Sequence, residues 1–182
     1  KARYFRILKE EGEHLLSLTN KVLTLSKLEN HQLKLEKDTC CVRSMLEDLA
    51  EKYKAKAVKH IVYKWNLQAD SVYADEEFLK EALSNLIDNA VKYSKESAEI
   101  TICCRQTEQT VCITVTDWGI GIPPDKQKHI FDKFYRVPTG NLHNVKGYGL
   151  GLFYVKSMVE KHGGTISVKS EPGKGTTFTI IL

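Results

Sequence analysis

The stretch Asp117-Trp118-Gly119-Ile120-Gly121-Ile122-Pro123 follows directly on a strand predicted for residues 111–117. The carboxylate of Asp117 can accept a hydrogen bond from an exocyclic amine, and the two glycines let backbone approach a flat ring closely. Adenine presents such an amine, whereas guanine presents a carbonyl oxygen that would leave the carboxylate unpaired. The stretch therefore favours a site for ATP over one for GTP, with a simple glycine-rich turn as the alternative.

A polar stripe runs along the helix predicted for residues 76–93. Three polar residues recur every four positions on one edge of this otherwise apolar helix, with a lysine close by: Glu81, Asn85, Asn89 and Lys92. Asparagine oxygens suit a Mg²⁺ ion that shares most of its shell with phosphate and water, and the lysine adds a cation for the phosphates. Tyr93 adds a stacking surface. A solvated helix face is the alternative interpretation.

A second glycine-rich stretch, Gly147-Tyr148-Gly149-Leu150-Gly151-Leu152, leads into a helix predicted for residues 150–161. Glycines at this junction leave backbone N–H groups available to phosphate oxygens, and the helix N-terminus adds partial positive charge. The spacing differs from G-x-G-x-x-G, no Walker lysine follows it, and the sequence has no HRD or DFG signature. An ordinary flexible hinge is the alternative.

Strands and helices alternate in the rest of the chain after residue 30. Asp75 is the expected N-cap of the 76–93 helix, and Asp38 or Thr39 that of an amphipathic helix beginning at Val42. Further strands are predicted at residues 32–36, 61–67, 72–74, 99–104, 165–170 and 176–182, and a short helix at 125–131. The pattern predicts an α+β fold, a two-layer α/β sandwich with a mixed sheet of about five strands and about three helices.

Residues 1–29 follow an apolar heptad spacing, with further apolar residues that widen the stripe. This is typical of a helix in a bundle, and a helix packed against its own domain is the alternative. The change of pattern places a boundary near residue 30, which divides the chain into residues 1–30 and 31–182. Because the sequence begins inside a helical pattern, we expect it to be a fragment of a longer protein.

Composition excludes several classes of protein. The 182 residues are 42% hydrophobic and 27% charged, which is ordinary for a soluble globular chain. The net charge of +4 comes from dispersed side chains and gives no argument for nucleic-acid binding. The five cysteines form no C-x-x-C pair and are interpreted as reduced intracellular thiols. No apolar run is long enough to span a membrane, so a membrane anchor is expected only in upstream segments.

Five short motifs occur in the order found in sensor histidine kinases. They are Asn85-x-x-x-Asn89-x-x-Lys92-Tyr93, Asp117-x-Gly119-x-Gly121, Phe131-x-x-Phe134, Gly147-x-Gly149-x-Gly151 and Gly173-x-Gly175-Thr176. From about residue 31 to its end, the chain resembles the ATP-binding catalytic domain of these kinases. Residues 1–29 are similar to the second helix of their dimerisation and phosphoacceptor hairpin. The resemblance implies the Bergerat-type ATP fold, with ATP and Mg²⁺ as cofactors and a mobile lid at about residues 137–146.

The resemblance also implies roles for individual residues. Asp117 would bind the adenine amine, Asn89 and Asn85 would hold Mg²⁺, Lys92 would contact phosphate and Arg136 would reach the γ-phosphate. Of these, Asn85, Lys92 and Arg136 are the candidate catalytic residues. The nucleotide is expected to contact a further set: Tyr93, Gly119, Gly121, Ile122, Phe134, Gly147, Tyr148, Gly149, Leu150, Gly151, Leu152 and Thr176.

One position bears on the choice between kinase and hydrolase. The ATPases that share the Bergerat-type fold carry a water-activating glutamate four residues before the magnesium asparagine. This chain has Asn85 at that position, and an amide does not act as a base near neutral pH. Transfer to a protein acceptor is therefore favoured over hydrolysis, and Glu81 is expected to support the helix rather than to act as a general base.

The acceptor histidine is missing from the sequence. None of the six histidines is followed by Glu or Asp, as an acceptor of this family would be, so the acceptor is expected on an absent upstream helix. The resemblance implies a homodimer through the hairpin, a response-regulator receiver domain as partner, and the cytoplasmic part of a membrane-anchored bacterial sensor. An ATP hydrolase of the same fold, a nonenzymatic dimerisation module and a serine kinase of anti-sigma type are the alternatives.

Overall fold

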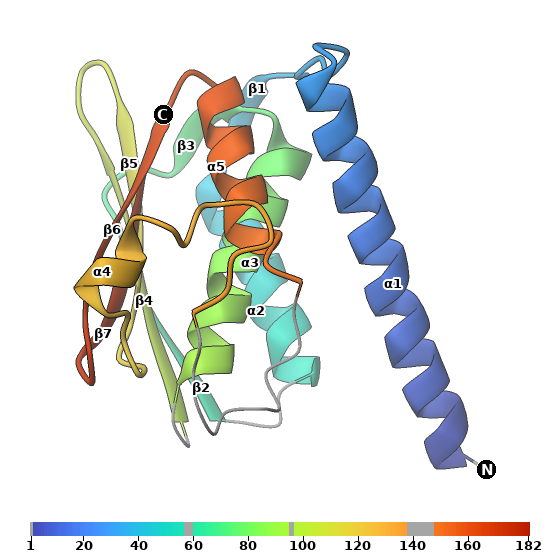
Figure 1. Cartoon of the computed structure of the whole chain (residues 1–182). Coiled ribbons are helices and arrows are strands. Elements are labelled where there is room, and N and C mark those ends of the chain that lie inside the picture. The colour runs from blue at the N-terminus through green and yellow to red at the C-terminus, as the bar shows by residue number, and fades with distance from the viewer. Residues whose placement is uncertain (1, 57–59, 95–96, 138–147) are drawn as a thin grey trace. The chain divides into compact units, whose positions relative to one another are not determined.

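The computed structural model describes residues 2–56, 60–94, 97–137 and 148–182 (Figure 1). It divides into two compact units, residues 1–35 and 36–182, which we describe one at a time.

The first unit consists of helix α1 (Ala2–Glu29) and the residues that end it. The helix predicted for residues 1–29 is thus confirmed. Many of its apolar side chains are exposed: Tyr4, Phe5, Leu8, Leu15, Leu16, Val22 and Leu23. Among the described helices none is long and apolar enough to cross a membrane.

The strand predicted for residues 32–36 is wrong. The backbone N–H groups of Gln32 and Leu33 both donate to the carbonyl oxygen of Lys27 and so complete the end of α1. The N–H of Glu36 donates to a side chain, the carboxylate of Asp75, at 2.9 Å. Alternating hydrophobicity alone does not make a strand where the backbone groups have other partners.

The second unit is built on a five-stranded sheet. Its strands are β2 (His60–Leu67), β4 (Ser97–Gln106), β5 (Val111–Asp117), β7 (Gly175–Ile181) and β6 (Thr165–Glu171), in that spatial order. β2 and β4 pair in parallel and all other pairs are antiparallel, which confirms the predicted mixed sheet. The register of β5 with β7 sets Asp117 opposite Thr176.

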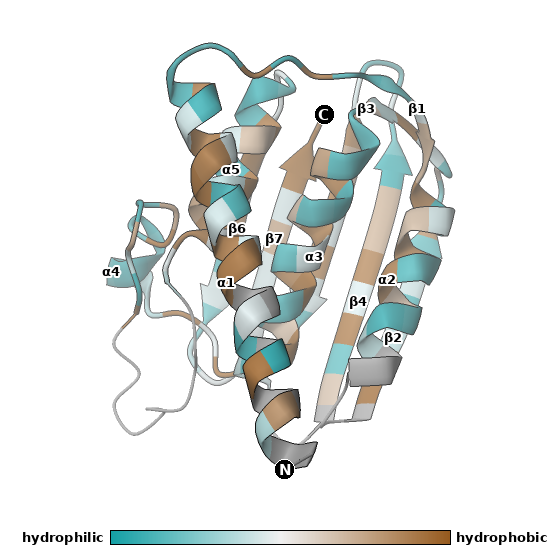
Figure 2. Ribbon diagram, turned by 90° about the vertical axis from the view of Figure 1, so that its right-hand side faces the viewer, coloured by the Kyte–Doolittle hydropathy of each residue, from teal (hydrophilic) through white to brown (hydrophobic). Residues whose placement is uncertain are grey.

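Three helices lie on one face of this sheet: α2 (Val42–Lys56), α3 (Glu76–Tyr93) and α5 (Gly151–Lys161). Figure 1 shows them together on the same side of the sheet, and Figure 2 looks onto the sheet from that side. A small antiparallel pair, β1 (Asp38–Cys41) with β3 (Ser71–Ala74), lies apart from the main sheet. The predicted two-layer sandwich is confirmed.

The core lies between the sheet and the helices. Burial alternates along β5, whose odd-numbered residues from Val111 to Asp117 are all buried. On α3 the buried residues share one face and meet buried residues of the sheet, as expected for an amphipathic helix: Leu79, Ala82, Leu83, Leu86, Ile87 and Ala90. The helix is therefore held by tertiary packing along its whole length.

Two local predictions are wrong. Asp38 and Thr39 do not cap α2, because both belong to strand β1; the first N–H of the helix, that of Val42, donates instead to the carbonyl of Asp70 at 2.7 Å. The helix predicted for residues 125–131 is only the four-residue α4 (Pro124–Gln127). Tight turns replace its second half.

The N-cap predicted at Asp75 is confirmed. One carboxylate oxygen accepts from the N–H of Phe78 at 3.3 Å, and the other accepts from the N–H of Glu36 at 2.9 Å. The backbone N–H of Asp75 donates to Nε2 of His162, which follows α5. One buried carboxylate thus begins α3 and fastens the segment that precedes β1.

Replacing Asp75 with alanine removes both acceptors. We expect a loss of about 2 kcal/mol in the free energy of unfolding, because α3 loses its N-cap and the N–H of Glu36 loses its acceptor at the same time. Urea unfolding measures this, with Asp70→Ala as the matched control. The side chain of Asp70 forms an exposed ion pair with Arg43, and its backbone carbonyl is unaffected by the substitution, so that variant should change stability by less than about 0.5 kcal/mol. Equal losses in the two variants would contradict the assignment.

Candidate functional site

The polar edge of α3 meets the start of α5. Asn85 is only 6% exposed, and its side-chain amide donates to the carbonyl of Glu81 at 2.8 Å. Its oxygen points toward Gly151, where a Cβ atom would come within 3.1 Å of Oδ1. Glycine at the first residue of α5 therefore lets the two helices approach until an amide oxygen lies beside a helix N-terminus.

The N-terminus of α5 has no side-chain cap. Leu150 occupies the N-cap position and is buried, and its apolar side chain provides no acceptor for the first N–H groups. These groups and the helix dipole form a suitable place for phosphate oxygens. The amide oxygen of Asn85 beside the same N-terminus would complement a cation bound to such phosphates.

Glu81 is held by α5. The hydroxyl of the buried Tyr154 donates to Oε2 of Glu81 at 2.8 Å. Burial, and next the charge of Glu81, raise the pKa of Tyr154 far above its usual range, so the phenol stays a donor at all ordinary pH values. Tyr154 was not singled out from the sequence, where it looks like any apolar position of the helix.

Asp117 ends β5 with its carboxylate buried. The side chain is 7% exposed, and Oδ1 accepts from the N–H of Gly119 at 2.8 Å. Burial raises the pKa of Asp117, while hydrogen bonds from the backbone of Gly119 and Thr176 partly offset that rise. A buried carboxylate with spare acceptor positions suits a ligand that donates hydrogen bonds.

The loop after Asp117 packs on the end of α3. A Cβ atom at Gly119 would lie 2.6 Å from the carbonyl oxygen of Tyr93, so only glycine fits there. Gly121 has a φ of +69°, and a Cβ atom would lie 2.0 Å from the carbonyl oxygen of Glu171. Both predicted glycines are thus required by close backbone contact.

The segments of the third and fourth motifs lie side by side. The N–H of Phe134 donates to the carbonyl of Gly149 at 3.1 Å, and a Cβ atom at Gly149 would meet Phe134 backbone at 2.6 Å. The ring of Phe134 is 63% exposed. Burial raises the pKa of Tyr93, at the end of α3, and the charge of Arg136 lowers it in part.

The other predicted residues divide into described and undescribed ones. Asn89 is half-buried and Lys92 exposed on α3; Tyr148 is exposed, Ile122 and Leu152 are half-buried, and Thr176 is buried. Gly147 and residues 138–146 of the predicted lid, including His143 and Lys146, lie outside the described residues.

The described side chains fit a nucleotide with a bound cation better than a metal held by protein alone. In the parts of the chain that the structure describes, no group of three or more His, Cys, Asp or Glu residues could hold a metal. Mg²⁺ keeps several waters and binds through few protein oxygens when phosphates share its shell, which agrees with Asn85 and Asn89 as its protein ligands.

The buried carboxylate of Asp117 predicts a particular pH dependence. Its pKa in the folded protein lies above the unfolded value of about 4. The folded state therefore holds the proton to higher pH, and this group costs stability increasingly as pH rises from about 4 through the folded pKa. Asp117→Asn lacks this cost, so the unfolding free energy of the variant minus that of the wild type should rise over this window and then level off.

Urea unfolding of the ligand-free protein at a series of pH values measures that difference. Asp70→Asn, at an exposed position, is the matched control and should give a nearly constant difference. A constant difference for Asp117→Asn as well would refute the burial effect.

Comparison with known proteins agrees with this geometry. Residues 74–182 match the family model for histidine kinase-, DNA gyrase B- and HSP90-like ATPases. The sensor histidine kinase RppB of Synechocystis sp. is 38% identical over 175 residues, which are 94% of this chain and 38% of that protein. The sensor protein SrrB of Staphylococcus aureus is 35% identical over 178 residues, 97% of this chain and 30% of that protein. The chain thus spans about a third of the length of these relatives.

Solved structures show the same similarity. The histidine kinase AdeS of Acinetobacter baumannii aligns with a TM-score of 0.81 and 27% identity over 98% of this chain and 82% of its own. Full-length ShkA in complex with AMPPNP aligns with a TM-score of 0.81 and 30% identity over 100% of this chain and 38% of its own. The expected ATP-binding domain is confirmed at this level: the chain belongs to the family of histidine kinase-, DNA gyrase B- and HSP90-like ATPases.

Proposed function

We propose that this chain is the catalytic part of a sensor histidine kinase that transfers the γ-phosphoryl group of Mg-ATP to a histidine outside these 182 residues. The observation that carries the proposal is the buried Asn85 amide, whose oxygen lies beside the uncapped N-terminus of α5. An amide here can share a cation with phosphates but cannot take a proton from water. Its position favours transfer over hydrolysis.

The nucleotide would lie between Asp117 and the start of α5. Asp117 would accept from the adenine amine, and Tyr93 and Ile122 would line the base together with Gly119, Gly121 and Thr176. The N–H groups of residues 149–152 would hold phosphate oxygens at the helix N-terminus. Tyr148, Phe134 and Gly147 are proposed to close the site around the nucleotide.

Four side chains are proposed to act on the phosphates or on their cation. Asn89 and Asn85 would hold Mg²⁺, which supplies charge stabilisation when it is bound. Lys92 and Arg136 would place positive charge near the transferring group, where it stabilises the charge that develops in the transition state. The proximity of Arg136 to Tyr93 supports this placement.

The hydrolase of the same fold has less support. The carboxylate one turn before Asn85 on α3, the side on which the hydrolases carry their glutamate, is that of Glu81, and it accepts a hydrogen bond from Tyr154. A carboxylate held by a buried phenol is poorly placed to activate a water molecule. In a nonenzymatic dimerisation module, the spare acceptor positions of the buried Asp117 carboxylate would have no ligand to bind.

The remaining parts of the proposal concern other proteins and segments. The exposed apolar stripe of α1 supports a second helix of a dimerisation hairpin, with residues 1–30 and 31–182 as the two domains. We propose a homodimer through that hairpin, onward transfer to an aspartate of a response-regulator receiver domain, and a cytoplasmic place in a membrane-anchored bacterial sensor.

Calorimetric titration with ATP and GTP in the presence of Mg²⁺ tests the base site. The wild type should prefer ATP, and Asp117→Asn should bind ATP roughly tenfold to a hundredfold more weakly because a charge-assisted hydrogen bond is lost. Its relative affinity for GTP should rise, because the amide can donate to the guanine carbonyl. Asp70→Asn serves as the control. Unchanged preference in Asp117→Asn would contradict the assignment.

Phosphate release and transfer, measured in parallel, separate the activities. We expect no steady release of phosphate by the chain alone, and acid-labile phosphohistidine on a separately supplied helical hairpin that carries a histidine followed by an acidic residue. Steady release would support the hydrolase, and absence of nucleotide binding would leave the dimerisation module.

Asn89→Ala tests the cation site. If Asn89 holds Mg²⁺, the variant should bind Mg-ATP about tenfold more weakly, whereas binding of ATP in excess EDTA should not change. Asn66→Ala, at an exposed position of β2, is the control. Equal losses with and without Mg²⁺ would assign Asn89 to the nucleotide rather than to the cation.

A further inference from the structure

The loop of residues 119–123, which we call the glycine loop, is fastened at two points. At the first, backbone groups hold Ile120: its N–H donates to the carbonyl of Tyr93 at 3.2 Å, and its carbonyl accepts from the N–H of Gly173 at 2.7 Å. The end of α3 and the β6–β7 turn thus clamp Ile120 from two directions. These bonds are independent of side-chain identity.

At the second point, two side chains hold Ile122. Its N–H donates to Oγ of Ser170 at 2.8 Å, and its carbonyl accepts from Nε2 of Gln127 at 2.9 Å. Both polar groups of one peptide residue are therefore bound by side chains from β6 and α4. No local sequence pattern indicates this pairing, because Gln127 and Ser170 lie 43 positions apart in the chain.

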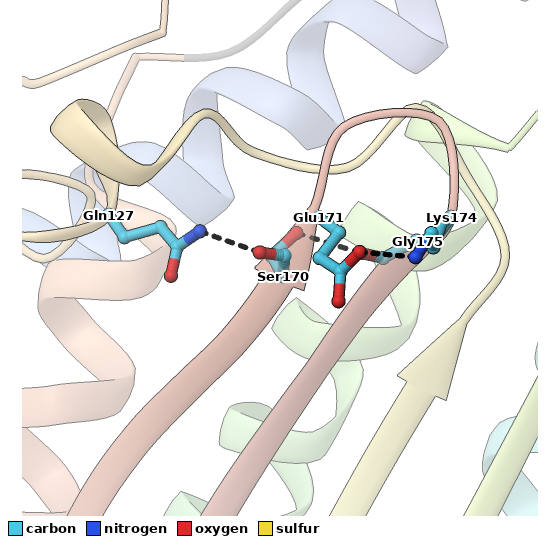
Figure 3. A network of polar contacts seen from close by, with 5 residues as sticks. All are labelled: Gln127, Ser170, Glu171, Lys174 and Gly175. Atoms are coloured by element: carbon cyan, nitrogen blue, oxygen red, sulfur yellow. Dashed lines mark hydrogen bonds and ion pairs between the residues drawn. The ribbon is translucent and has the colours of Figure 1, made fainter.

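The hydroxyl of Ser170 uses all of its hydrogen-bonding capacity. It accepts from the N–H of Ile122 and donates to the carbonyl of Gly175 at 2.8 Å; Figure 3 shows the bond with Gly175. It also lies 2.9 Å from Oγ1 of Thr176, which can donate to it. Thr176 is the register partner of Asp117. A single hydroxyl thus joins the glycine loop to the strand residue opposite the buried carboxylate.

Gln127 also uses both donors of its amide. Nε2 lies 2.9 Å from the carbonyl of Ile122 and 2.8 Å from that of Ser170, and Figure 3 shows the contact with Ser170. Two carbonyl acceptors fix which way the amide faces. Gln127 therefore bridges the glycine loop and the end of β6, and it comes from a four-residue helix that buries no side chain.

We propose that Ser170 and Gln127 are positioning residues that keep the glycine loop at the depth at which the base meets Asp117. This inference rests on the proposed function. Neither side chain needs to touch the nucleotide: each fixes Ile122, and the loop between Ile122 and Asp117 then has little freedom. Losing either side chain should relax the discrimination between bases and not merely weaken the fold.

Ser170→Ala tests the hydroxyl. We expect ATP to bind about tenfold more weakly, because the N–H of Ile122 loses its acceptor, and we expect the ratio of ATP to GTP affinity to fall. A purely structural role would weaken both nucleotides equally and leave that ratio unchanged. Ser170→Thr keeps the hydroxyl and should restore the ratio. Ser167→Ala, at an exposed position of the same strand, should behave as the wild type.

Gln127→Glu tests the amide without a change of shape. A carboxylate cannot donate to the two carbonyls and faces them with like partial charge, so the ratio of ATP to GTP affinity should fall here too. Gln109→Glu, in the exposed β4–β5 turn, controls for the added charge. Gln127→Glu leaves the core intact, so it tests the positioning role even if Ser170→Ala does not fold.

The outcomes separate the inference from the proposed function. If the wild type prefers ATP and both variants keep its affinity ratio, the inference is overturned and the proposed function stands. The inference is also overturned, and the proposed function stands, if the variants bind ATP and GTP more weakly by the same factor. If the wild type binds no ATP, both are overturned. A lower ratio in the variants, restored by Ser170→Thr, supports the positioning role.

Discussion

The packing of α3 against the sheet on one side and α5 on the other is the constraint on which the rest of the structure depends. The apolar face of α3 is buried along its length, so the helix has no freedom to rotate. Its polar edge is thereby directed at α5, where Tyr154 binds Glu81 and Gly151 contacts Asn85. The two ends are fixed as well, through Asp75 at the start and the carbonyl of Tyr93 at the finish.

The candidate site collects buried polar groups at one end of this core. Asp117, Asn85 and Thr176 are all nearly inaccessible, although burial of a polar group is costly without partners. Asp117 and Thr176 lie at the ends of β5 and β7, and Asn85 lies in the middle of α3, where its amide donates to the carbonyl of Glu81. The glycines at positions 119, 121, 149 and 151 let these backbones approach closely, and a side chain at any of the first three would collide with a neighbouring main chain. The surrounding loops therefore provide the close backbone contacts on which these buried polar groups depend.

Most of the regular elements could be predicted from the sequence, because hydrophobic periodicity reports directly which face is buried. The strand β5 and the helix α3 have the bounds that their patterns indicated. The failures share one cause. Residues 32–36 alternate in hydrophobicity like a strand, but N–H groups of this segment donate to the carbonyl of Lys27 and the carboxylate of Asp75. Threonine is a common N-cap of helices, but Thr39 belongs to β1 and pairs with β3. In each case a partner distant in sequence, or a competing local bond, took the backbone group.

By itself the sequence determined the order of the elements, the polar edge of α3 and the positions at which glycine is needed, because periodicity and backbone freedom are local properties. Only the tertiary structure decided which groups meet: the amide of Asn85 with the start of α5, the phenol of Tyr154 with Glu81, and Ser170 with both Ile122 and Gln127. Hydrogen bonds between groups tens of residues apart depend on chain topology and packing, which no local pattern of residues encodes.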